Sequence, residues 1–140
     1  MGKVIAFQLN GKEYAVPVHQ VLAIEKLHHI TRVPRTPAFV QGVMNLRGVV
    51  IPVIDLKKRF QIETETQNDH EKMMIVTVND LEVGLVVDAA TDVLDIASEN
   101  IEPQPEIVDT VKSEFIDGVA HLDQRLLMLL NLEKILTPLS

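Results

Sequence analysis

The chain has 140 residues, 46% of them hydrophobic, with 13 Lys and Arg against 20 Asp and Glu. This length allows one domain with a sizeable core, and the net charge of −7 argues against nucleic acid or an anionic membrane surface as a general partner. Cysteine is absent, which excludes disulfides and thiolate chemistry. Without a signal-like or membrane-length apolar run, the sequence predicts a soluble, intracellular protein.

Two strands and a turn open the chain. Residues 3–9 alternate apolar and polar side chains, and residues 12–16 form the expected return strand. Asn10-Gly11 between them is a strong signal for a two-residue hairpin turn. Residues 18–22 then place apolar side chains at helical spacing, which predicts a short helical turn before the chain becomes extended again.

A second helical turn is predicted further along. A short apolar alternation at residues 30–33 ends at Pro34. Thr36 is suited to the N-cap of a helix and Pro37 to its first position, because proline lacks the N–H that this position does not use. Gly42 suits the end of so short a helix.

The stretch 42–60 contains a turn, an apolar strand and a helix start in direct succession. Residues 45–48, Asn-Leu-Arg-Gly, predict a tight turn. Residues 49–54 are all apolar and mostly β-branched, so they predict a strand buried on both faces. Asp55 can then cap a helical turn. Arg47 is a charge at the tip of an apolar hairpin and must face solvent, a carboxylate or a partner.

The second half predicts further short elements. In chain order they are a polar, acidic loop at 61–71, strands at 73–78, 81–87 and 93–96, a helical turn at 98–102, an ambiguous segment at 106–112, a strand pair at 115–122 and 125–130, and a terminal helix at 132–136.

The two halves also resemble each other. Residues 42–58 match 118–134 without a gap, and residues 21–24 match 93–96 after a short insertion. Short strands rich in Val, Leu and Ile can look alike by composition, but the ordered series of turns, strands and caps favours two related units. Units this small suggest two packed β-barrels. We place them at about 12–60 and 72–131, with room for the terminal segments to cross between them.

The sequence shows no catalytic or metal-binding constellation. Its glycines form no nucleotide-binding motif, and the adjacent His28 and His29 point to opposite sides of an extended chain. The only dense carboxylate group lacks the spacing of a calcium loop; its members are Asp88, Asp92 and Asp95. We therefore predict a non-catalytic binding module without metal or cofactor. The competing hypothesis is a small hydrolase or ligand-binding barrel that uses His121 or these carboxylates.

More specific evidence comes from two runs, TPAFVQGVMNLRGVVIPVIDLKKRF and LEVGLVVDAATDVLDI. They closely resemble the CheW family of bacterial chemotaxis coupling proteins, and the similarity extends from Val4 to Leu136. Membership implies an all-β fold of two packed five-stranded SH3-like barrels with a few short helices. It also implies a non-catalytic adapter that joins the histidine kinase CheA to transmembrane chemoreceptors in the cytoplasm, at membrane receptor arrays.

Two relatives of this family carry a similar domain. The CheW-like half of CheV is followed by a receiver domain, and the regulatory domain of CheA follows a kinase. Since this chain ends at Ser140 with neither, we expect a free-standing coupling protein.

The resemblance implies that the receptor contributes the tip of a long helical hairpin, bound in a groove between the barrels. Such recognition needs an apolar trough. The residues that we expect to line it are Val18 and Val21 from one half and Ala90 and Val93 from the other. The alternative is that all four are ordinary core residues.

For the kinase, the resemblance implies end-to-end packing against the related barrel of the CheA regulatory domain. Our candidates are Ile30, Thr31, Val33 and Arg47. Arg47 could instead hold its own turn through a carbonyl of its own chain. One departure is Ala23, where some family members carry a glutamate, so a kinase contact through that acid is in doubt here.

The predicted core gathers the inward positions of the strands from both halves. It comprises Ile5, Phe7, Leu9, Val49, Ile51, Val53, Val76, Val78, Leu85, Val87, Leu127 and Leu129.

Overall fold

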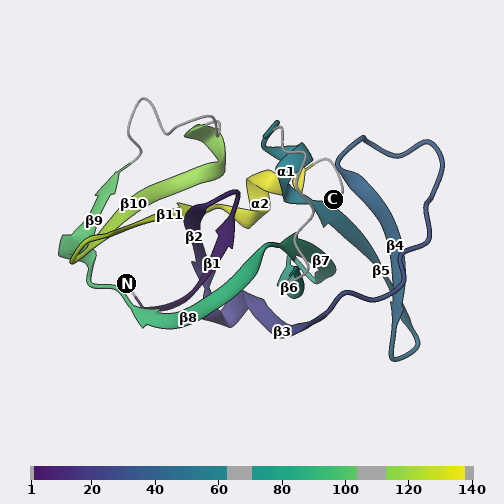
Figure 1. Ribbon diagram of the computed structural model, residues 1–140, viewed down its shortest axis with the longest axis horizontal. Helices are drawn as coiled ribbons and strands as arrows, with labels where there is room; N and C mark the ends of the chain where they lie inside the picture. Colours follow the sequence, from purple (N-terminus) through teal and green to yellow (C-terminus); the bar gives the residue numbers. More distant parts are fainter. Residues whose placement is uncertain (1, 63–70, 104–112, 138–140) are drawn as a thin grey trace.

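The computed structural model describes residues 2–62, 71–103 and 113–137. Two β-sheets lie side by side, with two short α-helices between them on one side (Figure 1). The strand order is β8-β1-β2-β11-β10-β9 in the first sheet and β3-β6-β7-β5-β4 in the second. The prediction of a β fold with a few short helices is confirmed. The first sheet has one strand more than expected, because the short β9 pairs with β10.

The first sheet contains β1 (Lys3–Leu9), β2 (Lys12–Pro17), β8 (Ala89–Asp95), β9 (Ile101–Pro103), β10 (Ile116–Leu122) and β11 (Arg125–Leu130). The second contains β3 (Val21–Lys26), β4 (Val40–Leu46), β5 (Val49–Asp55), β6 (Lys72–Val78) and β7 (Leu81–Val87). The helical elements are α1 (Leu56–Arg59), α2 (Leu132–Ile135) and the 3-10 turns Val18–Gln20, Ser98–Asn100 and Ser113–Phe115.

Each sheet closes towards a barrel through the chain that follows one of its edge strands. In the first sheet, β8 lies at one edge and β9, the next strand in sequence, lies at the other. In the second sheet, the chain after β3 crosses to the opposite edge, where Thr31 forms an isolated bridge with Val43 of β4. This closure leaves few unpaired edges, which is the usual advantage of a small barrel.

The predicted turns and caps form as the residue types require. Asn10 and Gly11 both have positive φ, 54° and 79°, as does Arg47-Gly48 with 54° and 85°. Asp55 accepts a hydrogen bond from the Lys58 N–H at 3.2 Å and so caps α1. Its counterpart in the repeat, Asn131, caps α2 in the same way through the Lys134 N–H at 3.0 Å.

The strands pair across the two halves of the chain, which differs from the predicted ranges 12–60 and 72–131. The hairpin of β1 and β2 joins β8, β10 and β11, whereas the hairpin of β6 and β7 joins β3, β4 and β5. Each sheet therefore takes the first two strands of one repeat and the remaining strands of the other. The links are two parallel pairs, β2 with β11 and β5 with β7. Parallel pairing is non-local, so no turn in the sequence specifies it.

Two local predictions are wrong. No helix begins at Thr36, because residues 38–39 form a turn and the chain enters β4 at Val40. The strand of residues 49–54 is not buried on both faces, since Val49 and Val50 are 49% and 63% exposed. β7 pairs with β5 only from Val53 onwards, so the first half of β5 projects beyond the end of β7.

The core has three parts. The largest fills the space between the sheets and includes Phe7, Val76 and Leu85. Smaller clusters fill the interior of the first sheet, around Ala6 and Leu127, and of the second, around Met73. Of the residues predicted to form the core, all are buried except Val49. We call the largest cluster the central core.

Aromatic rings run through the central core from the first sheet to the helices. Successive ring centroids of Phe7, Tyr14, Phe60 and Phe115 are 5.9, 5.8 and 5.7 Å apart, within the range in which aromatic pairs attract each other. Burial raises the pKa of Tyr14 to about 12. Arg59 of α1 lies near Phe39 and Phe115 and donates to the Ile135 carbonyl of α2 at 2.8 Å. These contacts fix the two barrels against each other.

Candidate functional site

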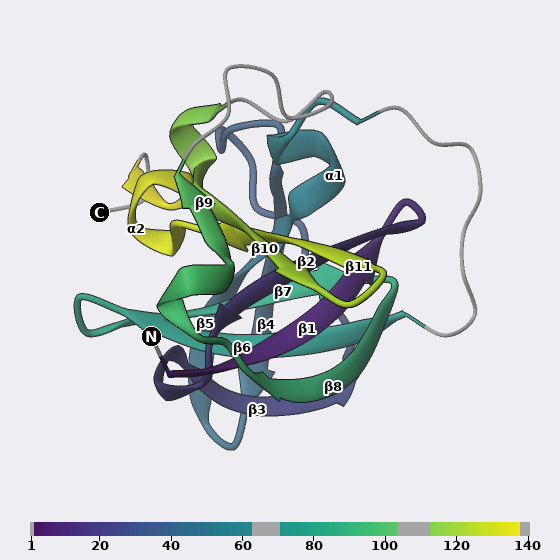
Figure 2. The same ribbon diagram turned by 90° about the vertical axis from the view of Figure 1, so that its left-hand side faces the viewer.

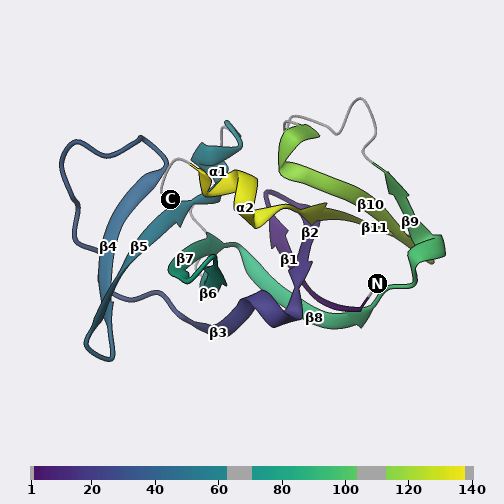
Figure 3. The same cartoon turned by 180° about the vertical axis from the view of Figure 1, so that it is seen from behind.

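The predicted receptor residues lie along one margin of the central core. Figures 1, 2 and 3 show β3 and β8 on the same side of the molecule, opposite α1 and α2. The strand register places Val21 opposite Val76, Ala90 opposite Phe7 and Val93 opposite Ile5. Since directly opposed residues share a face and all three partners belong to the central core, these side chains face that core.

The exposure of these residues differs. Val18 and Val21 are partly buried and pack against the central core, while Val93 is 57% exposed. Ile24, which the sequence reasoning missed, lies opposite the core residue Met74 and is 42% exposed. A register shift between Val21 and Ala23 breaks the alternation of β3, so counting by twos misassigns Ile24. We call this set, Val18, Val21, Ile24, Ala90 and Val93, the β3/β8 margin.

The predicted kinase residues do not form one cluster. Thr31 and Val43 exchange two backbone hydrogen bonds of 2.8 Å, and Ile30 packs against the interior of the second sheet. Val33 lies in the exposed loop beyond them. Arg47 lies at the far end of β4, four residues from Val43, or about 13 Å at the rise of a strand.

Arg47 borders a hollow at the open end of the second barrel, with a volume of about 200 Å³. Its lining combines apolar side chains with one positive and one negative residue: Leu22, Ala23, Leu46, Arg47, Val49, Ile51, Ile75 and Glu82. Leu22 is 52% exposed. This hollow could not be predicted, because a run of apolar residues does not show where a strand extends past a neighbouring strand. We call it the barrel-end hollow.

Among the residues that the structure describes, Arg47 makes only a loose ion pair. Its guanidinium is 3.8 Å from the Glu25 carboxylate, and its side chain is 84% exposed. The turn itself depends on Asn45, whose side-chain oxygen accepts from the Gly48 N–H at 2.9 Å. Ala23 and Glu25 are two residues apart and lie on the same face of β3, opposite Ile75 and Met73. The carboxylate beside Arg47 therefore comes from the next position on that face after Ala23.

The corresponding end of the first barrel carries charges instead. Arg125 stands at the position in the repeat that Val49 occupies in the second barrel. It donates to both oxygens of Glu13, at 3.0 and 2.6 Å, and to both oxygens of Asp92, at 2.9 and 3.0 Å. The hydrogen bonds from Arg125 to Asp92 hold the pKa of Asp92 below its usual value. The two ends are therefore chemically different.

The residues of the competing enzymatic hypothesis do not converge. Asp88 pairs with Lys57 at 2.7 Å, Asp92 pairs with Arg125, and His121 lies 3.4 Å from Glu102. Within the described ranges, no group of three or more His, Cys, Asp or Glu could hold a metal ion. No helix in the same ranges is long and apolar enough to cross a membrane.

The geometry thus combines two small barrels, an apolar margin built from both and a mixed hollow at one end. This arrangement is that of a binding module with several contact surfaces. The chain matches the family model of the CheW-like domain over residues 3–139, so it belongs to that family of chemotaxis scaffold proteins.

Named relatives agree with this assignment. The chain is 41% identical to the chemotaxis protein CheW of Bacillus subtilis, over 96% of this chain and 86% of that one. It is 35% identical to the chemotaxis protein CheW of Klebsiella aerogenes, over 95% and 80%. Among solved structures, the scaffolding protein TtCheW from Thermoanaerobacter tengcongensis superposes with a TM-score of 0.88 at 36% identity, covering 96% of this chain and 86% of that one.

Proposed function

We propose that this protein couples the CheA histidine kinase to the cytoplasmic tips of chemoreceptors, and that it is recruited from the cytoplasm to receptor arrays. The observation that carries the proposal is the β3/β8 margin, where apolar side chains from both halves meet beside the central core. An adapter needs separate surfaces for its partners, and the barrel-end hollow provides a second one.

For the receptor, the β3/β8 margin supports contact with the apolar face of a helical hairpin. Helix recognition of this kind uses apolar anchors along a strip, and Ile24 and Val93 are the most exposed apolar side chains of the margin. Val18 and Val21 would form the floor, because they pack on the central core.

We expect Val93→Glu to weaken receptor binding at least tenfold, since it places a charge in an apolar contact. Stability should change by no more than about 0.5 kcal/mol, because the side chain is mostly exposed. Titration with a receptor cytoplasmic fragment measures the loss of receptor affinity, and titration with the CheA regulatory domain shows whether kinase binding is kept. Thermal unfolding measures the change in stability. Val21→Asp is less decisive, because its packing on the central core predicts a loss of stability as well.

Leu126→Glu is the matched control, because Leu126 is exposed to a similar degree but lies on β11, away from the margin. If Val93→Glu and Leu126→Glu bind receptor equally well, the margin is not the receptor site.

For the kinase, the second barrel supports end-to-end contact with the related barrel of the CheA regulatory domain. Leu22 and Val49 offer exposed apolar area beside Arg47, and interfaces favour this combination of apolar and arginine side chains. Ile30, Thr31 and Val33 remain part of the proposal, further along the same barrel.

We expect Arg47→Lys to weaken kinase binding about tenfold while unfolding stays within about 0.5 kcal/mol of wild type. Lysine keeps the charge but loses the planar fork that can bind a carboxylate twice, and an ion pair as exposed as Arg47 with Glu25 contributes little to stability. The measurement is a titration with the CheA regulatory domain. Normal kinase affinity in both Arg47→Lys and Arg47→Ala would remove Arg47 from the proposed interface.

A further inference from the structure

Positive charge is concentrated in one segment of this acidic protein. From Lys26 to Ile54 the sequence contains Lys26, Arg32, Arg35 and Arg47 and no Asp or Glu. The other 9 Lys and Arg share the rest of the chain with all 20 Asp and Glu. A local field of opposite sign to the net charge selects anionic partners at that place.

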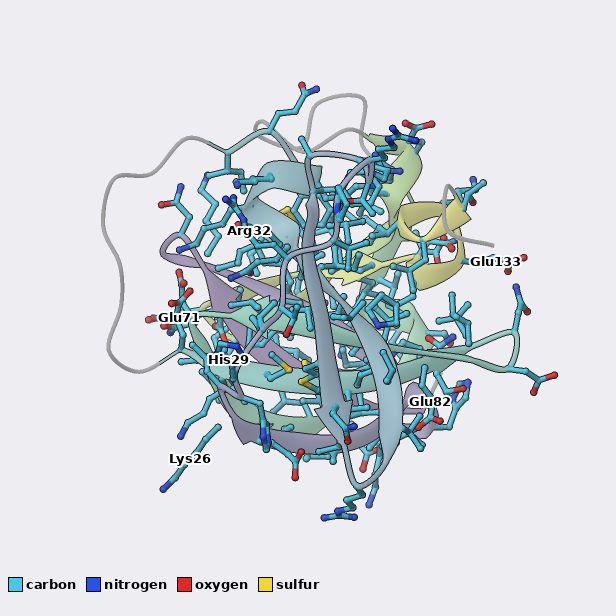
Figure 4. All side chains as sticks on the ribbon, turned by 90° about the vertical axis from the view of Figure 1, so that its right-hand side faces the viewer. Lys26, His29, Arg32, Glu71, Glu82 and Glu133 are labelled. Atoms are coloured by element: carbon cyan, nitrogen blue, oxygen red, sulfur yellow. The ribbon has the colours of Figure 1, made fainter. Side chains whose placement is uncertain are left out.

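Figure 4 views the end of the second barrel and shows Lys26, His29 and Arg32 along one side of it, with Glu82 and Glu133 on the other. Glu71 lies on the same side as Arg32, but its carboxyl interacts with Lys57 of α1. Among the residues that the structure describes, Arg32 and Arg35 make no ion pair. Both guanidinium groups are therefore available to a partner.

The loop that carries these arginines is exposed but well anchored. Residues 31–38 are all exposed. The Thr31–Val43 bridge holds the start of the loop, and a hydrogen bond from the Asp55 N–H to the Phe39 carbonyl, 2.8 Å long, holds its end. Pro34 and Pro37 restrict the backbone between these anchors. Arg35 adopts a φ of 62° in the turn of residues 34–35, a region that side chains other than glycine seldom enter.

A hollow lies between this loop and the start of β4, with a volume of about 420 Å³. This volume falls within the range of ligand sites. Its walls are mostly apolar, with one charge: Arg32, Val33, Pro34, Thr36, Pro37, Ala38, Val40 and Gln41. A ligand that fits them must combine a negative charge with an apolar group.

We propose that the loop of residues 31–38 is a docking site for an acidic peptide segment of a partner protein, with an apolar side chain in the hollow and carboxylates on Arg32 and Arg35. Guanidinium groups bind carboxylates in bidentate geometry, which favours a discrete acidic segment. A membrane or a nucleic acid would present an extended negative surface, which the 20 acidic residues of this protein would repel. The site is separate from the β3/β8 margin and from the barrel-end hollow, but it shares Val33 with the proposed kinase surface.

Fluorescein-labelled synthetic peptides test the proposal by anisotropy titration at low salt. We expect the full-length protein to bind GEELEEG more tightly than GQQLQQG, which lacks the charges, and than GEEGEEG, which lacks the apolar anchor. The double variant Arg32→Glu/Arg35→Glu should bind GEELEEG at least about tenfold more weakly, because a charge-assisted hydrogen bond contributes roughly that factor.

The control variant is Lys3→Glu/Lys134→Glu, which makes the same change in net charge at exposed positions of β1 and α2. It should bind GEELEEG nearly as well as wild type. Equal loss in both double variants would show that net charge alone drives binding and would overturn the proposal. So would equal affinity for the three peptides, or stronger binding to phosphatidylserine vesicles that GEELEEG does not compete away.

Discussion

Replacing Gly42 by Ala is expected to destabilise the protein by about 3 kcal/mol, at the upper end of the cost of a strained backbone residue. A Cβ at this position would lie 2.3 Å from the Thr31 carbonyl oxygen, and the φ of 156° is one that other residues rarely adopt. The obstacle is backbone that is itself fixed by the Thr31–Val43 bridge, so the clash cannot be relieved by a side-chain rotation. Urea or thermal unfolding measures the loss.

Gly2→Ala is the control for this substitution, because a Cβ there meets nothing within 4 Å. Gly118→Ala should also destabilise the protein but by less, since its Cβ would lie 2.8 Å from the Glu102 carbonyl oxygen at the corresponding place in the repeat and its φ is not in the unusual range. Comparable stability of Gly42→Ala and Gly2→Ala would contradict this reading of the close approach. The Cβ of Gly42→Ala would push away the segment that contains Ile30 and Thr31. Because both residues belong to the proposed kinase surface, the affinity for the kinase should fall more than the affinity for the receptor.

Local chemistry made much of the fold predictable. Hairpin turns such as Asn10-Gly11 and caps such as Asp55 depend on residues a few positions apart, so the sequence contains their whole cause. The repeat was predictable for the same reason, because each copy keeps its own turn, strand and cap. Gly42 and Gly118 are matched positions in the repeat, and both allow a close approach of the neighbouring backbone.

The exchange of strands between the two halves was not predictable from local pattern. β2 and β7 are both strands that follow a tight turn, and each presents the same backbone donors and acceptors along its free edge. Their choice of partner, β11 for β2 and β5 for β7, is decided by how the complete apolar faces fill the central core. The choice of partner strand therefore depends on the whole chain and cannot be predicted from a short stretch of sequence.

The candidate sites show a similar division. Val21 and Val93 could be proposed from the sequence because apolar residues at related positions of the two halves are expected to lie close together wherever the halves pack. Ile24 and Leu22 were missed because the register shift in β3 changes which residues share a face. Val49 was assigned to the core because its neighbours are apolar, and only the short overlap of β5 with β7 exposes it.

Replacing Lys57 by Met is expected to destabilise the protein by about 3 kcal/mol at neutral pH, because it leaves a largely buried carboxylate without its counter-ion. The Lys57 ammonium is 2.7 Å from Asp88, and the two side chains are only 14% and 13% exposed. Asp88 also accepts from the Asn10 N–H at 2.7 Å, at the point where the chain passes from the second sheet to the first. The pair therefore joins α1, the first hairpin and the crossover between the sheets.

The stability lost in Lys57→Met should depend on pH in a definite direction. Burial raises the pKa of Glu71, and Lys57 opposes that shift, so removing Lys57 should raise the folded-state pKa of Glu71 further. Groups whose pKa is higher in the folded than in the unfolded protein destabilise it when ionised, and the penalty fades as pH falls through the folded pKa. The loss of unfolding free energy in Lys57→Met should therefore become smaller as the pH falls from 7 to 4.

Two further variants test whether the ion pair of Lys57 with Asp88 is the cause of the stability loss. Lys58→Met removes the same charge from an exposed position of the same helix and should change stability by no more than about 0.5 kcal/mol. Lys57→Met/Asp88→Asn should recover much of the loss, because the amide oxygen can still accept from the Asn10 N–H without requiring a counter-ion. A deficit in Lys57→Met that is independent of pH, or one that Asp88→Asn does not relieve, would mean that the methylene stem of Lys57 matters and its ion pair with Asp88 does not.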